Sequence, residues 1–256
     1  MPRPAAGSLP LRDILFTQGL GTRRACDALI LDGHVRIGGQ VVDDPQAAFQ
    51  TEGLVFDVDG VAWPFHDKAL ILLHKPAGYE CSLKPSAWPG VHTLLPLPLR
   101  QRGVQPIGRL DQDTTGLLLL TDDGTLLHRL TSPKHHVPKV YHARTVHPVT
   151  PEQCARLVAG VVLHDDPQPV RASAARALED RLLELTLTQG KYHQVKRMVA
   201  AVGNRVEALH RVAFGALTLP AGLAPGQWCW VCEQEVLGDL AGPPANEGQG
   251  ASATAG

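Results

Sequence analysis

The chain has 256 residues, of which 44% are hydrophobic and 19% are charged, and its formal net charge is −1. The length allows two domains, and the near-neutral charge excludes recognition of a polyanion by bulk attraction alone. The charge is uneven, because residues 61–150 contain ten Lys and Arg against six Asp and Glu, a net charge of +4. We expect any polyanion-facing surface to lie mainly in this central part.

The first 20 residues lack the apolar segment of a secretory signal, and no apolar run approaches the roughly 20 residues that cross a bilayer. We therefore expect a cytoplasmic protein that has reduced thiols and no membrane partner. Cys229 and Cys232 form a Cys-x-x-Cys pair, but no second pair of ligands accompanies them. We predict that the chain binds no metal.

The N-terminal part predicts a small helical unit over residues 9–60, after a disordered leader at 1–8. Thr22 is a good N-cap for a helix that stops near Gly33. Arg23 and Arg24 project from the first turn of that helix. The other expected elements are a helix at 9–17, a hairpin at 34–42 and a strand at 54–58.

A linker is expected at 61–68, a second domain at 69–238 and a disordered tail at 239–256. The second domain is expected to contain strands at 69–73, 117–120, 139–146, 182–187 and 205–214, and helices at 125–130, 151–158 and 192–202. Strand pairs with only occasional helices favour an α+β fold with a mostly antiparallel sheet over a doubly wound one.

The most informative motif is the loop at 108–116, which carries Asp111 and precedes four consecutive leucines. Four leucines bounded by glycines predict a buried strand, which is a rigid support for a reactive group. A single carboxylate can act as a nucleophile or base at a sugar carbon. A buried carboxylate needs a nearby cation to stay ionised, and the candidates are Arg109, Lys196 and Arg197.

The helix expected at 192–202 has an apolar stripe that includes Tyr192, whereas His193, Lys196 and Arg197 fall on its other side. These three are a candidate phosphate-binding group, and a solvated basic face is the alternative. Tyr141 lies in an alternating strand, where it either packs in the core or stacks on a flipped base.

Lys75 follows a buried strand directly, in a Lys-Pro-x-Gly turn, where it is a candidate for binding a phosphate. Lys134 and Lys139 are further candidates from the basic central part.

Taken in order, the motifs at 75–78, 108–111, 139–141 and 190–198 resemble those of S4-containing ribosomal RNA pseudouridine synthases. The unit at 9–60 is similar to the S4 RNA-binding domain. The resemblance implies an α+β catalytic domain with a central cleft, in which Asp111 is the catalytic aspartate and Tyr141 packs on the base. Lys196 would pair with the aspartate, in a position where related families place an arginine.

The resemblance also implies a ribosomal RNA partner contacted by the basic side chains named above, no cofactor, and a monomer. Segments 131–136, 190–198 and 202–211 are most similar to members that modify the 16S rRNA, at uridine 516. The substrate would be this RNA or a small-subunit assembly intermediate. Whether Asp111 attacks C1′ or removes the 2′ proton stays open.

Three alternatives stay open at this stage. The enzyme could act on 23S rRNA, or the chain could bind rRNA without catalysis. A glycoside hydrolase would also place a carboxylate at a sugar carbon, but it usually needs a second one, for which Asp113 and Asp122 are near.

Overall fold

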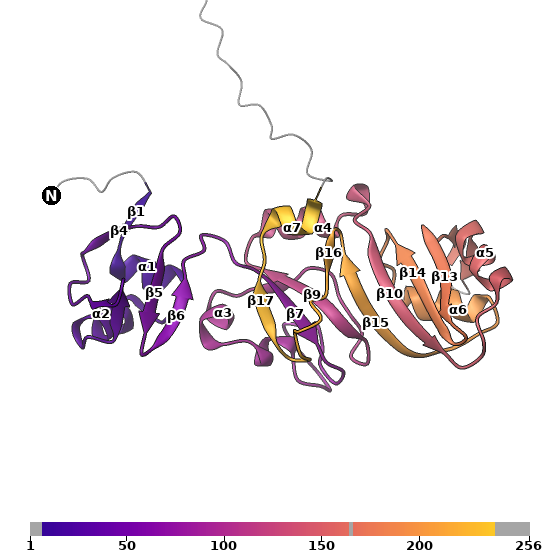
Figure 1. Ribbon diagram of the computed structural model, residues 1–256, viewed down its shortest axis with the longest axis horizontal. Helices are drawn as coiled ribbons and strands as arrows, with labels where there is room; N and C mark the ends of the chain where they lie inside the picture. Colours follow the sequence, from indigo (N-terminus) through magenta and orange to yellow (C-terminus); the bar gives the residue numbers. More distant parts are fainter. Residues whose placement is uncertain (1–6, 164–165, 239–256) are drawn as a thin grey trace, which may run out of the picture.

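The computed structural model describes residues 7–163 and 166–238. Figure 1 shows a small N-terminal unit at one end of the long axis, followed by a large sheet whose strands β17 and β7 lie nearest to that unit. Most of the leader expected at 1–8, and the whole of the tail expected at 239–256, lie outside the described residues.

The N-terminal unit contains helices α1 (Leu11–Thr17) and α2 (Arg23–Leu31) and an antiparallel sheet in the order β3-β2-β5-β6. Its strands are β2 (Val35–Ile37), β3 (Gln40–Val41), β5 (Val55–Val58) and β6 (Val61–Pro64), and β1 (Ser8–Pro10) pairs separately with β4 (Ala48–Gln50). Thr22 caps α2 as expected, since its hydroxyl accepts a hydrogen bond from the Ala25 amide at 3.2 Å. The described part of the chain therefore contains the predicted helix-helix-hairpin order.

Two boundaries of this unit differ from the sequence prediction. Residues 61–64, expected to be linker, form β6, because Trp63 lies opposite Phe56 and both side chains are buried. The first helix begins at Leu11 rather than at residue 9, because Ser8–Pro10 pair with β4 as a strand. Both differences depend on partners far away in the sequence, which a local pattern does not reveal.

The large sheet has nine strands, seven of which run in the order β13-β14-β10-β15-β9-β7-β17. The strands are β7 (Leu70–Lys75), β8 (Gln105–Pro106), β9 (Thr115–Thr121), β10 (Lys139–Thr145), β13 (Ala174–Glu179), β14 (Leu182–Leu187), β15 (Val206–Phe214), β16 (Leu217–Thr218) and β17 (Trp228–Trp230). Among the described pairings of this sheet, β15 with β9 is parallel and the others are antiparallel. The α+β prediction with a mostly antiparallel sheet is confirmed.

Strand β9 is buried on both faces of the sheet, as its four leucines predicted. Leu118 and Leu120 join the core cluster that contains α6, whereas Leu117 and Leu119 join the cluster that contains α4 and α7.

The described helices of this domain are α3 (Leu97–Gln101), α4 (Gly124–Thr131), α5 (Pro151–Ala159), α6 (Gln194–Ala201) and α7 (Glu233–Leu237), with 3-10 turns η1 (Val91–Leu94) and η2 (Pro133–His135) and a small hairpin of β11 (Val161–Leu163) and β12 (Asp166–Val170). Among the described residues, no helix is long and apolar enough to span a bilayer.

Candidate active site

Asp111 lies in a short turn that leads directly into the buried strand β9. The Thr114 amide donates to the Asp111 carbonyl at 3.1 Å, which closes the turn. Gly116 has a φ of +108°, and a Cβ there would lie 2.2 Å from the carbonyl oxygen of Arg211. Glycine is therefore required where β9 meets β15. The Asp111 side chain is 28% exposed, so it is partly shielded but accessible to a substrate.

Helix α6 faces the Asp111 turn, and Lys196 of this helix and His193 just before it contact the Asp111 carboxylate. Lys196 Nζ lies 3.3 Å from Asp111 Oδ2, and His193 Nε2 lies 3.3 Å from Asp111 Oδ1. His193 precedes the first turn of α6 with a φ of 48°, a left-handed conformation that is uncommon for a residue other than glycine. Of the three cations considered for Asp111, the structure places Lys196 at the carboxylate, and His193, which was considered as a phosphate contact, lies at its other oxygen.

Lys196 contacts a second carboxylate, that of Asp113, more closely than it contacts Asp111. Its Nζ donates to the two Asp113 oxygens at 2.7 and 2.9 Å. Burial alone would raise the pKa of Asp113, but the hydrogen bond from Lys196, its positive charge and a backbone hydrogen bond together lower the pKa on balance. Burial likewise acts to lower the pKa of Lys196, and the two carboxylates raise it on balance. Lys196 is therefore held as an ammonium ion between two carboxylates.

Arg197, the other cation considered for Asp111, donates to the Tyr192 carbonyl at 3.0 Å. Tyr192 is 76% exposed and stacks on the His193 ring at 3.8 Å, which corrects its expected place in the apolar stripe. The reason is that α6 begins only at Gln194, so Tyr192 precedes the helix.

Lys75 was expected to bind a phosphate, but the structure corrects this prediction. Its side chain is fully buried, and its Nζ donates to four backbone carbonyls. They belong to Pro76, Asp111, Gln112 and Thr114, at 3.1, 3.0, 3.2 and 2.8 Å. Because its ammonium group is enclosed, Lys75 holds the Asp111 turn in place and contacts no solvent-borne phosphate.

Lys139 is also more enclosed than expected. Its Nζ donates to the Val137 carbonyl at 2.8 Å and lies 5.2 Å from the centre of the Phe214 ring. Burial, reinforced by the nearby Arg211, lowers its pKa to about 8. It is a half-buried amine with a weakened charge rather than a surface cation, which corrects its expected role as an exposed RNA contact.

The other predicted RNA contacts lie at the surface. Arg109 and Lys134 are exposed, and so are Arg23 and Arg24 on the first turn of α2. Arg23 lies 3.4 Å from the Asp13 carboxylate and 4.1 Å from the centre of the Phe16 ring. These positions suit phosphate contact, which stays a prediction.

Tyr141 is 9% exposed and lies on β10 between Leu185 of β14 and Arg211 of β15. Tyr141 therefore packs in the core, as one of its two interpretations expected, and its contact with a base stays a prediction.

Arg211 was missed by the sequence analysis, although an arginine in an apolar alternating strand was a usable signal. It is 2% exposed, and its Nε donates to the Leu117 carbonyl at 2.7 Å. Its buried Nη2 has no hydrogen-bond partner in the part of the chain that the structure describes.

Comparison with known proteins shows the family. The family described as RNA pseudouridylate synthase matches residues 69–201, and the S4 domain matches residues 9–52. Ribosomal small subunit pseudouridine synthase A of Salmonella typhimurium (strain LT2) is 38% identical over 88% of this chain and 97% of that protein, and the protein of the same name from Escherichia coli (strain K12) is 37% identical over the same shares. A solved structure described as pseudouridylate synthase matches with a TM-score of 0.63 and 33% identity, over 89% of this chain and 98% of that one.

A mixed sheet that presents an aspartate to a cationic helix, joined to an S4 domain, defines an RNA-modifying enzyme with a separate RNA-binding domain. The chain belongs to the RNA pseudouridylate synthase family, and it is an RNA pseudouridine synthase with an N-terminal S4 domain. The resemblance predicted from the sequence motifs is confirmed.

Proposed function

We propose that this enzyme converts one uridine of ribosomal RNA to pseudouridine, at position 516 of the 16S rRNA, with Asp111 as the catalytic carboxylate. The observation that carries the proposal is the Asp111 carboxylate at the start of a buried strand, 3.3 Å from Lys196 Nζ. Relatives that match over nearly their whole length carry the name ribosomal small subunit pseudouridine synthase A, which supports the choice of RNA.

The reaction breaks the bond between C1′ of the ribose and N1 of the uracil and forms a bond between C1′ and C5. N1 gains a proton and C5 loses one, so the product is an isomer and neither oxidant nor cofactor is consumed. The base must first leave the RNA stack, at a cost of a few kcal/mol. Asp111 then either attacks C1′ or removes the 2′ proton, and both routes require its ionised form.

Each neighbouring group has a place in this scheme. Lys196 keeps a positive charge beside Asp111, His193 lies at its other carboxylate oxygen, and the enclosed Lys75 fixes the turn that carries it. Tyr141 packs against the extruded base from β10. Arg109, Lys134 and Arg197 bind phosphates around the site, and Arg23 and Arg24 bind RNA from the S4 domain.

We further propose that the enzyme acts as a monomer in the cytoplasm, where ribosomal subunits are assembled. Its substrate is the 16S rRNA or an assembly intermediate of the small subunit. Shape and a structured RNA set the affinity more than bulk attraction does, because the net charge is only −1.

The test maps pseudouridine in rRNA from cells with and without the gene, and then in purified 16S and 23S rRNA treated with the enzyme. We expect the modification at 16S position 516 to disappear without the gene and to return with the enzyme. Loss of a 23S modification instead would contradict the proposed target. Release of free uracil would indicate a hydrolase, and RNA binding without any conversion would contradict catalysis.

A further inference from the structure

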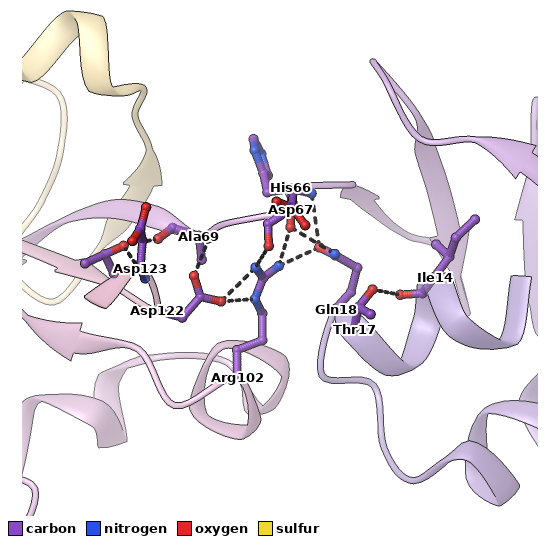
Figure 2. A network of polar contacts seen from close by, with 10 residues as sticks. Ile14, Thr17, Gln18, His66, Asp67, Ala69, Arg102, Asp122 and Asp123 are labelled. Carbon is purple, nitrogen blue, oxygen red and sulfur yellow. Dashed lines mark hydrogen bonds and ion pairs between the residues drawn. The ribbon is translucent and has the colours of Figure 1, made fainter. Parts of the chain in front are cut away.

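Arg102 lies at the junction of the two domains and is almost completely buried. It follows α3, and its side chain is 3% exposed, which is rare for an arginine. Figure 2 shows its guanidinium group between the S4 domain on one side and the catalytic sheet on the other.

The guanidinium group binds three separate parts of the chain. Its Nη1 donates to Gln18 Oε1 of the S4 domain at 2.8 Å and to the His66 carbonyl at 2.8 Å. Its Nη2 donates to the Asp67 carbonyl of the connecting segment at 3.0 Å, and its Nε donates to Asp122 Oδ2 of the catalytic domain at 2.7 Å. One planar side chain therefore joins the S4 domain, the connector and the catalytic domain.

The S4 side of this junction is tightly packed. Gln18 is fully buried, and its amide group donates to the His66 carbonyl at 3.0 Å and accepts from the His66 amide at 3.2 Å. Next to it, Gly19 has a φ of +80°, and a Cβ there would lie 2.2 Å from the Pro98 carbonyl oxygen. The S4 backbone at Gly19 therefore packs directly against the backbone of α3. This leaves little room for the S4 domain to rotate relative to α3.

The catalytic side connects the junction to the Asp111 turn. Asp122 Oδ1 accepts from the Ala69 amide at 2.7 Å, at the start of the second domain. Asp122 directly follows strand β9, and Asp111 lies just before the other end of the same strand. A fully buried strand is rigid, so the position of Asp111 is fixed relative to Arg102.

We propose that Arg102 is a positioning residue, which holds the S4 domain in one orientation so that RNA bound there presents its target uridine to Asp111. A flexible connection would let the two RNA contacts move independently and would lower the effective concentration of the target at the site. The proposal rests on the proposed function for its kinetic part only, since the fixed orientation can be measured without RNA.

The test uses two variants that weaken the junction and one matched control. Arg102→Met removes all the hydrogen bonds of the guanidinium group. Gln18→Met removes the S4 acceptor of Arg102 and the two bonds of Gln18 to His66 but keeps the pair of Arg102 with Asp122, so it serves if the first variant folds poorly. Arg100→Met is the control, because Arg100 is an exposed arginine on the same helix.

Domain orientation is measured as the distance between two spin labels. The labels are attached at Val41→Cys in the S4 domain and Leu178→Cys in β13, both exposed positions, in a background in which Cys229 and Cys232 are replaced by Ser. Steady-state rates of 16S rRNA modification are measured on the same variants without labels.

We expect one narrow distance distribution for the parent and the Arg100→Met control, and broad distributions for Arg102→Met and Gln18→Met. KM for the RNA should rise about tenfold in both junction variants, with kcat within about twofold of the parent value. Arg102→Lys should give a distribution width and a KM between those of the parent and those of Arg102→Met, because an ammonium group keeps the charge but not the planar geometry.

Narrow distributions in both junction variants would overturn the fixed orientation. Broad distributions with an unchanged KM would overturn the role in presenting RNA. If the parent does not modify RNA at all, the proposed function fails, whereas the distance distributions still decide whether Arg102 fixes the S4 domain.

Discussion

Replacing Lys75 with methionine tests whether this buried lysine organises the Asp111 turn. The substitution keeps a similar length but removes the ammonium group and its bonds to four carbonyls, of which those of Asp111, Gln112 and Thr114 belong to the turn itself. Burial lowers the pKa of Lys75, with its neighbouring carboxylates opposing the shift, so the lysine carries a desolvation cost that its hydrogen bonds offset.

The magnitude follows from these contacts. A hydrogen bond to a charged group contributes about 1.5–3 kcal/mol, and the contributions of four bonds on one atom do not add. Removing the buried ammonium group also removes its desolvation cost. We therefore expect the free energy of unfolding of Lys75→Met to fall by about 3 kcal/mol, the value of one to two such bonds.

The loss of activity in Lys75→Met should be larger than a loss of folded enzyme alone would cause. Once the carbonyls lose their donor, the Asp111 turn can shift, and a displacement of about 1 Å can reduce a rate about 100-fold. Denaturant unfolding and release of tritium from C5 of labelled uridine would measure the two effects. Lys84→Met, at an exposed lysine, is the control and should change neither. A Lys75→Met enzyme with the parent's unfolding free energy and kcat would show that Lys75 does not hold the Asp111 turn in place.

Three further predictions concern the surroundings of the site. Lys196→Met should raise the pKa of Asp113, because the cation that lowers it is gone, and should reduce kcat about 100-fold; carboxyl carbon NMR titration and tritium release would check this. Gly116→Ala should destabilise the fold by about 3 kcal/mol or more, because its Cβ would collide with the Arg211 backbone, and urea unfolding would detect the loss. Lys139 has a pKa lowered to about 8, so between pH 8 and about 10.4 the unfolded chain holds a proton that the folded chain has released. The free energy of unfolding should therefore rise across this window in the parent and rise less in Lys139→Met; equal slopes would contradict the assignment.

The Asp111 turn and the helix opposite it were predictable because their signals are local. Four leucines between glycines identify β9, and the spacing of His193 and Lys196 predicts that both lie on one side of this segment, where both contact Asp111. Sequence spacing did not show that Lys196 lies nearer to Asp113 than to Asp111, since that choice depends on the conformation of the turn.

The enclosed residues were the ones that the sequence misplaced. The local sequence around Lys75 and Lys139 does not differ from that around surface lysines. Their burial results from carbonyls and rings that distant segments of the chain supply. Arg102 had no local signal either, because its partners are Gln18, the connector and Asp122, up to 84 residues away. Hydrophobic periodicity in a sequence indicates only which face of a single helix or strand is apolar. It therefore does not predict which charged side chains are buried by tertiary contacts.

The most direct test compares Asp111→Asn with Asp113→Asn in single-turnover conversion of 16S rRNA. Both carboxylates contact Lys196, but Asp113 is 55% exposed, so its ion pair with Lys196 contributes little free energy. We predict that Asp111→Asn binds the RNA and forms no pseudouridine, whereas Asp113→Asn stays within about tenfold of the parent rate. Conversion by Asp111→Asn at the parent rate would contradict the account.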